Sequence, residues 1–132
     1  MKIYQFKIIL VDIEPLIWRR IQVPENYTFR DLHVAIQDAM GWWDYHLHAF
    51  TTGTYKIGIP EECYGENCDE DEIPTKAGWK ILINDYFVHP HQLMHYEYDF
   101  GDSWEHIVHF ETVFEKERGV KYRLCCINQK KA

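Results

Sequence analysis

The residues best equipped for chemistry lie in one segment, 96–106, which reads YEYDFGDSWEH. Its Gly101-Asp102 pair predicts a two-residue turn between antiparallel strands, because such turns favour glycine and aspartate. Cross-strand pairing about that turn would set Glu97 opposite His106, with Asp99 on the same face. The segment therefore predicts a hairpin that carries two carboxylates and an imidazole on one face.

Carboxylate and imidazole groups together can bind a divalent metal or perform acid–base chemistry. If the strand expected at 45–52 lies beside the hairpin, the candidate metal ligands are His46, His48, Glu97, Asp99 and His106. A structural interpretation stays open beside this one. A facing Glu–His pair is also an ordinary charge-assisted hydrogen bond, and an aspartate near a tight turn commonly accepts from backbone N–H groups.

Two adjacent tryptophans extend the candidate site. Trp42 and Trp43 directly follow a predicted helix end and cannot both point inward, so one is expected on a binding surface. The candidate binding residues are Trp42, Trp43, His46, His48, Glu97, Asp99, Asp102, Trp104 and His106. The sequence contains no nucleophile elbow and no phosphate-binding glycine loop. No catalytic residue and no cofactor is predicted, and a divalent metal is the alternative.

The acidity of the chain is concentrated in one stretch. The formal net charge is −7, and seven of the 21 acidic residues lie between Glu61 and Glu72, where no basic residue occurs. An acidic loop at about 60–77 is therefore expected, extended by its own charge repulsion. Nucleic acid is disfavoured as a partner, because binding phosphates needs a basic stripe that this sequence lacks.

Length and hydropathy predict a single domain, 1–132, located in the cytoplasm. A chain of 132 residues with 46% hydrophobic content can bury one core without staples. No apolar run approaches the ~20 residues that span a bilayer, and the N-terminus lacks the signal-peptide pattern, so no membrane partner is expected. The spacings of Cys63, Cys68, Cys125 and Cys126 suit zinc poorly, which favours buried or idle thiols.

One helix has clear start and stop signals. Thr28 and Asp31 predict a capping box at its start, and apolar residues then recur at helical spacing to about residue 40. Gly41 fits the left-handed residue that commonly follows a helix. The sequence therefore predicts a helix over about 28–40.

Most other segments favour strands. Runs rich in branched and aromatic residues predict strands at 2–11, 16–23, 45–52, 92–100, 103–114 and 120–127. The span at about 79–87 fits both types, and a short helix is favoured there. The predicted fold class is α+β, a mainly antiparallel sheet of about five to six strands packed on one long helix (about 28–40).

Three stretches, taken together, resemble a known family. They are Pro15-Leu16-Ile17-Trp18-Arg19-Arg20, the motif residues from Leu32-His33 through Gly41-Trp42 to His46-Leu47-His48-Ala49-Phe50, and the segment 96–106. From about residue 2 to residue 126 the chain resembles the plasmid pRiA ORF-three-like family, which includes proteins labelled as TnpR passengers of insertion elements. The resemblance implies a compact α+β domain. Resolvase activity is not carried over, because the serine nucleophile and basic DNA-binding apparatus are missing.

Three functional hypotheses remain from the sequence. The leading one is a non-enzymatic binding or interaction module with a protein or small-molecule partner. The second is a metal-dependent hydrolase-like enzyme that uses the His/Glu/Asp cluster. The third is a nucleic-acid-associated protein of a mobile element.

Overall fold

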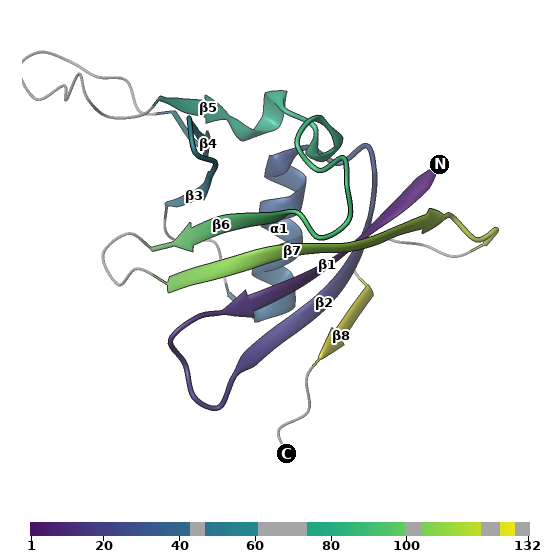
Figure 1. Cartoon of the computed structure of the whole chain (residues 1–132), viewed down its shortest axis with the longest axis horizontal. Helices are drawn as coiled ribbons and strands as arrows, with labels where there is room; N and C mark the ends of the chain where they lie inside the picture. Colours follow the sequence, from purple (N-terminus) through teal and green to yellow (C-terminus); the bar gives the residue numbers. More distant parts are fainter. Residues whose placement is uncertain (43–46, 61–73, 100–103, 120–124, 129–132) are drawn as a thin grey trace, which may run out of the picture.

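The computed structural model describes residues 1–42, 47–60, 74–99, 104–119 and, for the backbone, 125–128. Within these residues the strands join in one eight-stranded sheet with the order β5-β4-β3-β6-β7-β1-β2-β8 (Figure 1). The elements are β1 (Lys2–Leu10), β2 (Ile17–Pro24), α1 (Phe29–Met40), β3 (His48–Thr51), β4 (Lys56–Gly58), β5 (Thr75–Ala77), β6 (Leu93–Tyr98), β7 (Trp104–Glu115) and β8 (Cys125–Asn128).

The centre of the sheet is built by β7, β1 and β2, which pair antiparallel. The predicted hairpin at 2–11 and 16–23 is confirmed. Apolar residues alternate along β1, so that Tyr4, Phe6 and Ile8 face the core while Gln5 and Lys7 face the other side. This alternation gives the sheet one core-facing surface, the inner face, and one opposite surface, the outer face.

The helix α1 forms as its sequence signals predict. The Thr28 hydroxyl accepts from the Asp31 backbone, and the Asp31 carboxylate accepts from the Thr28 backbone, which completes a capping box. At the other end Gly41 adopts a left-handed conformation, with φ of 78°. The Trp42 N–H donates to the Gln37 carbonyl over 2.9 Å, the closing bond of a Schellman motif. This ending fixes where Trp42 leaves the helix.

The segment at 79–87 does not form the short helix that the sequence favoured. It holds two 3-10 turns instead, η2 (Gly78–Lys80) and η3 (Ile83–Asp85). Two of its backbone groups form hydrogen bonds with the segment just before and at the start of α1. The Phe29 N–H donates to the Ile81 carbonyl and the Ile83 N–H donates to the Tyr27 carbonyl, both over 2.9 Å. The segment keeps a few local bonds, such as Phe87 N–H to the Ile83 carbonyl, but these long-range bonds take the place of a continuous α-helical series.

The predicted fold class is wrong in its architecture. The sheet is larger than five to six strands, it is mixed because β4 and β5 pair parallel, and it dominates the fold. The two short strands β4 and β5 lie inside 53–78, where little regular structure was expected. The expected acidic loop falls largely on 61–73, which lies outside the described residues. The most extensive contact between two elements is the pairing of the long strands β1 and β7, and the contacts of α1 with the strands are far fewer.

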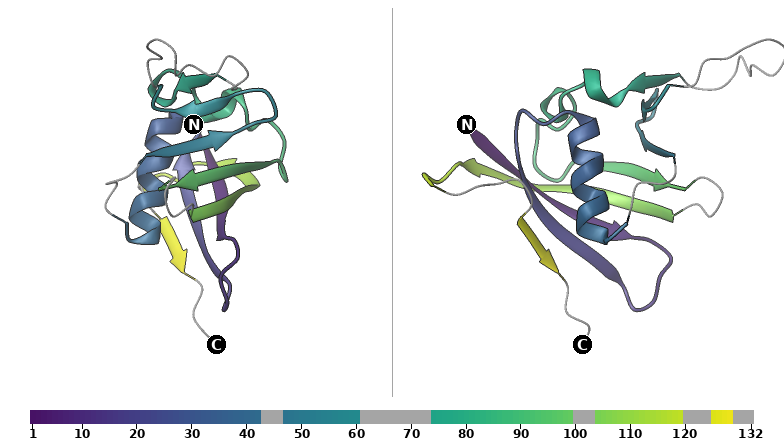
Figure 2. Two further views of the ribbon diagram at one scale, coloured as in Figure 1. Left: turned by 90° about the vertical axis from the view of Figure 1, so that its left-hand side faces the viewer. Right: turned by 180° about the vertical axis from the view of Figure 1, so that it is seen from behind.

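Figures 1 and 2 show α1 lying across one face of the sheet, and the opposite face carries none of the described helices. The core lies between α1 and the inner face, where Phe29, Leu32 and Ile36 of the helix meet Phe6, Ile8, Phe50 and Phe110 of the sheet. No described helix is long and apolar enough to cross a membrane. The functional question therefore concerns what the inner cluster and the open outer face do.

Candidate functional site

The final hairpin has a different register from the one that the sequence predicted. Tyr98 pairs with Trp104, Glu97 with Glu105, and Tyr96 with His106. The predicted pairing of Glu97 with His106 is therefore wrong. The strands end at residue 98 and start again at residue 104, so the connection is longer than Gly101-Asp102, and this shift by one position moves Glu97 and His106 to opposite faces.

The inner face carries a buried polar cluster centred on Tyr96. The Tyr96 hydroxyl lies 2.8 Å from Nδ1 of His33, and it accepts from the Gln37 amide over 3.0 Å. All three residues are buried. Because Gln37 donates to the hydroxyl oxygen, the hydroxyl proton is available to His33, which fits a neutral imidazole with Nδ1 as the acceptor.

Two more histidines complete the cluster. The ring of His48, from β3, stacks on the ring of His33 at a centroid distance of 3.4 Å and an interplanar angle of 9°. His106, from β7, is fully buried, and its Nδ1 lies 3.3 Å from the Tyr96 carbonyl. The cluster thus joins α1, β3, β6 and β7 at one end of the core.

Burial keeps the His106 ring neutral. Desolvation lowers the pKa of His106 from 6.5 to about 4, against the backbone hydrogen bonds with Tyr96 and Trp104, which raise it, and His95 lowers it slightly further. Nε2 of His106 is buried and makes no hydrogen bond within the described part of the chain. A buried polar atom in this state is costly, so the ring acts mainly as a packing group.

Three large aromatic side chains lie on the inner side of the sheet, next to the His106 end of this cluster. Trp42 stacks on Tyr98 with centroids 5.0 Å apart at 16°, and it meets Trp104 at 6.2 Å. The rings of Trp42 and His106 meet edge to face, with centroids 5.0 Å apart. Trp104 is 37% exposed, whereas Tyr98 is buried. We call Trp42, Tyr98 and Trp104 the aromatic platform.

The structure separates the predicted site residues into three groups. Trp42, His48, Trp104 and His106 lie together on the inner side, at the platform or in the cluster beneath it. Glu97 lies on the outer face, opposite Glu105, and Asp99 follows the end of β6 with a positive φ of 60°. Trp43, His46 and Asp102 lie outside the described residues.

The five proposed metal ligands are not brought together as a set. Glu97 and His106 are on opposite faces of β6 and β7, so the sheet backbone lies between them. Among the described residues, no three His, Cys, Asp or Glu side chains are grouped so that they could hold a metal ion. The geometry therefore gives no support to acid–base or metal chemistry by that cluster.

Sequence reasoning missed three members of the buried cluster, namely His33, Gln37 and Tyr96. A signal for two of them was present. His33 and Gln37 are four residues apart and border the apolar stripe formed by Leu32 and Ile36, so they share the buried side of the helix. Polar residues at such positions need partners inside the core, and the tyrosine of the neighbouring strand supplies one.

Fold and site define the class: a small strand-rich domain with histidines packed in its core and tryptophans at the edge of that core. The chain matches the plasmid pRiA4b ORF-3-like proteins over residues 2–132, and it belongs to this family. The family resemblance seen in the sequence is thereby confirmed.

Two relatives place the chain more closely. It is similar to the uncharacterized protein y4hQ of Sinorhizobium fredii, at 32% identity over 112 residues, which is 85% of this chain and 55% of that protein. It is also similar to the crystal structure of the protein of unknown function MM3350 from Methanosarcina mazei Go1, with 42% identity and a TM-score of 0.78. That match covers 96% of this chain and 68% of the other. The chain thus spans about half the length of the curated relative.

Proposed function

We propose that this protein is a non-enzymatic interaction module, acting in the cytoplasm, whose recognition surface is the aromatic platform. The observation that carries the proposal is the convergence of Trp42, Tyr98 and Trp104 from three separate segments, with Trp104 still 37% exposed. Tryptophan and tyrosine dominate the binding energy of protein interfaces, because they bury large area with few rotatable bonds.

Trp42, the central residue of the platform, is held in place by contacts within the chain. Trp42 is fixed at its backbone by the Schellman bond to Gln37 and at its ring by Tyr98 and His106. A surface that is already ordered loses little conformational entropy on binding, which increases the affinity available from a given contact area. In this proposal His106, which contacts Trp42, serves binding by supporting the shape of the platform.

Neighbouring charges and apolar groups favour a basic protein segment as the partner. Leu47, 41% exposed, bonds through its carbonyl to the N–H of Asp99, so it lies at the same end of the sheet as the platform. Glu97 and Glu105 lie at that end of β6 and β7 on the outer face, across the sheet from the platform, and Asp99 follows the end of β6. An apolar centre with carboxylates beyond its edge complements an aliphatic or aromatic side chain flanked by lysine or arginine long enough to reach past the strand ends.

Selection from a random peptide library displayed on phage tests this function. Sequences recovered on the wild-type protein should share an apolar residue beside basic ones, and their binding should weaken with salt. Trp104→Ala should weaken the selected peptides by at least about 30-fold, as expected for a hot spot worth about 2 kcal/mol.

Trp79→Ala is the matched control, because Trp79 is 51% exposed and belongs to η2, away from the platform. It should leave peptide binding within about twofold of wild type. Peptides whose binding is equally insensitive to both substitutions would contradict the platform as the recognition surface.

A further inference from the structure

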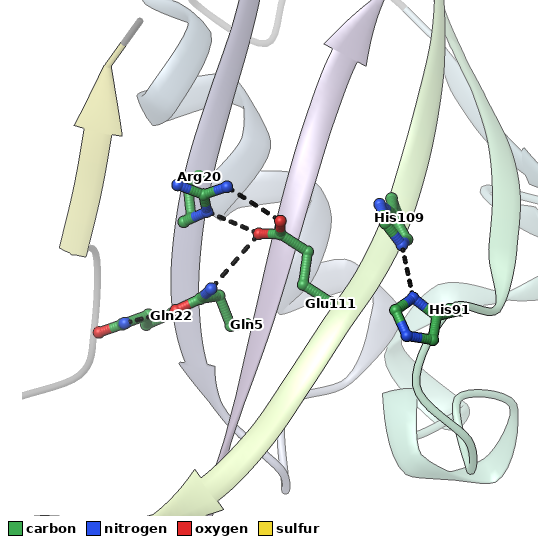
Figure 3. Close-up of polar contacts among 6 residues, drawn as sticks. All are labelled: Gln5, Arg20, Gln22, His91, His109 and Glu111. Atoms are coloured by element: carbon green, nitrogen blue, oxygen red, sulfur yellow. Dashed lines mark hydrogen bonds and ion pairs between the residues drawn. The ribbon is translucent and has the colours of Figure 1, made fainter.

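The outer face of the sheet holds a second arrangement, independent of the proposed platform, in which two histidines converge. His91 precedes β6, and His109 lies in β7 beside it (Figure 3). Nδ1 of His91 and Nε2 of His109 are 3.4 Å apart. The two nitrogens form a long hydrogen bond when one of them carries a proton, since most such bonds measure ~2.7–3.2 Å.

The same separation also fits a shared metal ion when both nitrogens are unprotonated. Two nitrogen ligands at ~2.0–2.1 Å from a tetrahedral zinc lie about 3.3–3.4 Å apart. Imidazole is a favoured ligand of Zn²⁺, Cu²⁺ and Ni²⁺. We propose that His91 and His109 form a two-histidine site for such a divalent transition-metal ion, with solvent completing the coordination.

The backbone around His91 is fixed in a way that suits a prepared ligand. His91 has a positive φ of 77°, which is uncommon for a residue other than glycine. Its N–H donates to the Phe110 carbonyl over 2.6 Å, and the Phe110 N–H donates to Gln92 over 3.0 Å. These bonds tie His91 directly to the strand that carries His109.

The loop before His91 is fastened by one side chain. The Gln92 side-chain oxygen accepts from the N–H groups of Val88 and His89, and its amide donates to the Tyr86 carbonyl. A loop held at three points keeps the imidazole of His91 in place, and this lowers the ordering cost of binding an ion.

Nearby charges also permit a cation at this position. Glu111, two residues beyond His109, is an anion whose pKa is lowered chiefly by its hydrogen bonds with Arg20. Arg20 is bound to Glu111 at 2.6 and 2.9 Å (Figure 3). The Lys7 ammonium lies over the ring of Trp18, on β2, at 4.6 Å. Lys7 is the cross-strand neighbour of His109, but its charged group and that of Arg20 are engaged with Trp18 and Glu111.

Zinc titration of the purified full chain, followed by calorimetry, tests the site. His91→Asn keeps a residue that tolerates positive φ, and His109→Gln keeps a polar strand residue. Each substitution should raise the zinc dissociation constant at least tenfold relative to wild type, because each removes one of the two protein ligands. Wild-type affinity in both variants, or no saturable zinc binding in the wild type, would overturn the proposal.

His89→Asn and His95→Gln are the controls, and both should keep the zinc dissociation constant of the wild type. His89 belongs to the same loop, and His95 lies on the same face near Glu105, at 3.8 Å. All four variants keep every cysteine, so binding to thiols would be unchanged in each of them. As a second measurement, the imidazole proton signals of His91 and His109 in the wild type should shift together on adding Zn²⁺, and a shift confined to other histidines would count against the site.

Discussion

At the scale of single residues, Tyr96 connects the buried groups that the helix and the sheet contribute. Its hydroxyl is the partner of both His33 and Gln37, and all three are inaccessible to solvent. Removing that hydroxyl would leave two buried polar groups without this partner.

Tyr96→Phe should therefore reduce the free energy of unfolding by roughly 2 kcal/mol. The matched control is Tyr86→Phe, since the Tyr86 hydroxyl also donates one hydrogen bond, to the Leu93 carbonyl over 3.2 Å, but in a solvent-exposed setting. The control should cost less than about 1 kcal/mol in urea unfolding. Equal costs for the two variants would show that burial of the hydroxyl network is unimportant.

His106 makes stability depend on pH. Its pKa is about 4 in the folded chain and near 6.5 when exposed, so the unfolded chain binds the proton more readily between these values. Stability from this residue is complete above pH 6.5 and is lost as the pH falls towards 4. The loss over that window should reach roughly 3 kcal/mol.

His106→Phe cannot bind a proton and should flatten the curve of unfolding free energy against pH between about 6.5 and 4. The exposed His89→Gln should keep the wild-type slope. Urea unfolding at closely spaced pH values measures both. A His106→Phe protein with the full wild-type slope would mean that other groups carry the acid sensitivity.

At the scale of elements, the end of α1 links helix stability to the platform. Gly41 occupies the left-handed position that allows the Trp42 N–H to reach Gln37. A Cβ at Gly41 would meet no atom within 4 Å, so Gly41→Ala isolates the conformational cost.

Gly41→Ala should lower the unfolding free energy by about 1 kcal/mol, because alanine disfavours positive φ. Gly53→Ala is a matched control, since Gly53 is equally open but is not among the glycines with positive φ. The control should change stability by less than about 0.5 kcal/mol in thermal unfolding. A neutral Gly41→Ala would argue against strain at this helix end.

The elements with local signals could be predicted from the sequence. The helix boundaries follow from Thr28, Asp31 and Gly41, whose side chains or backbone act within a few residues. The first hairpin follows from its alternation of apolar residues. The segment 79–87 could not be predicted, because its backbone bonds go to Tyr27 and Phe29, about fifty residues earlier.

The register of the last hairpin could not be predicted for a related reason. Propensity alone would bury Ile107 and expose His106, yet His106 is fully buried. The reason is the set of contacts that Trp42, Tyr96 and the Tyr96 carbonyl make with its ring, which come from other segments. Trp104 and His106 share a face as the sequence predicted, whereas Glu97 was predicted on the wrong face relative to His106.

At the scale of the whole molecule, the two faces of the sheet divide the proposed roles. The inner face packs on α1 and ends at the aromatic platform, whereas the outer face carries the His91–His109 pair and the Arg20–Glu111 ion pair (Figures 1 and 3).

The most direct test of the platform is nuclear magnetic resonance of the tryptophan indole N–H groups during titration with a selected basic peptide. The account predicts that the signals of Trp42 and Trp104 move in proportion to binding, while those of Trp18 and Trp79, which lie on β2 and η2, stay within about a line width. Movement of Trp18 or Trp79, with Trp42 and Trp104 unchanged, would contradict it.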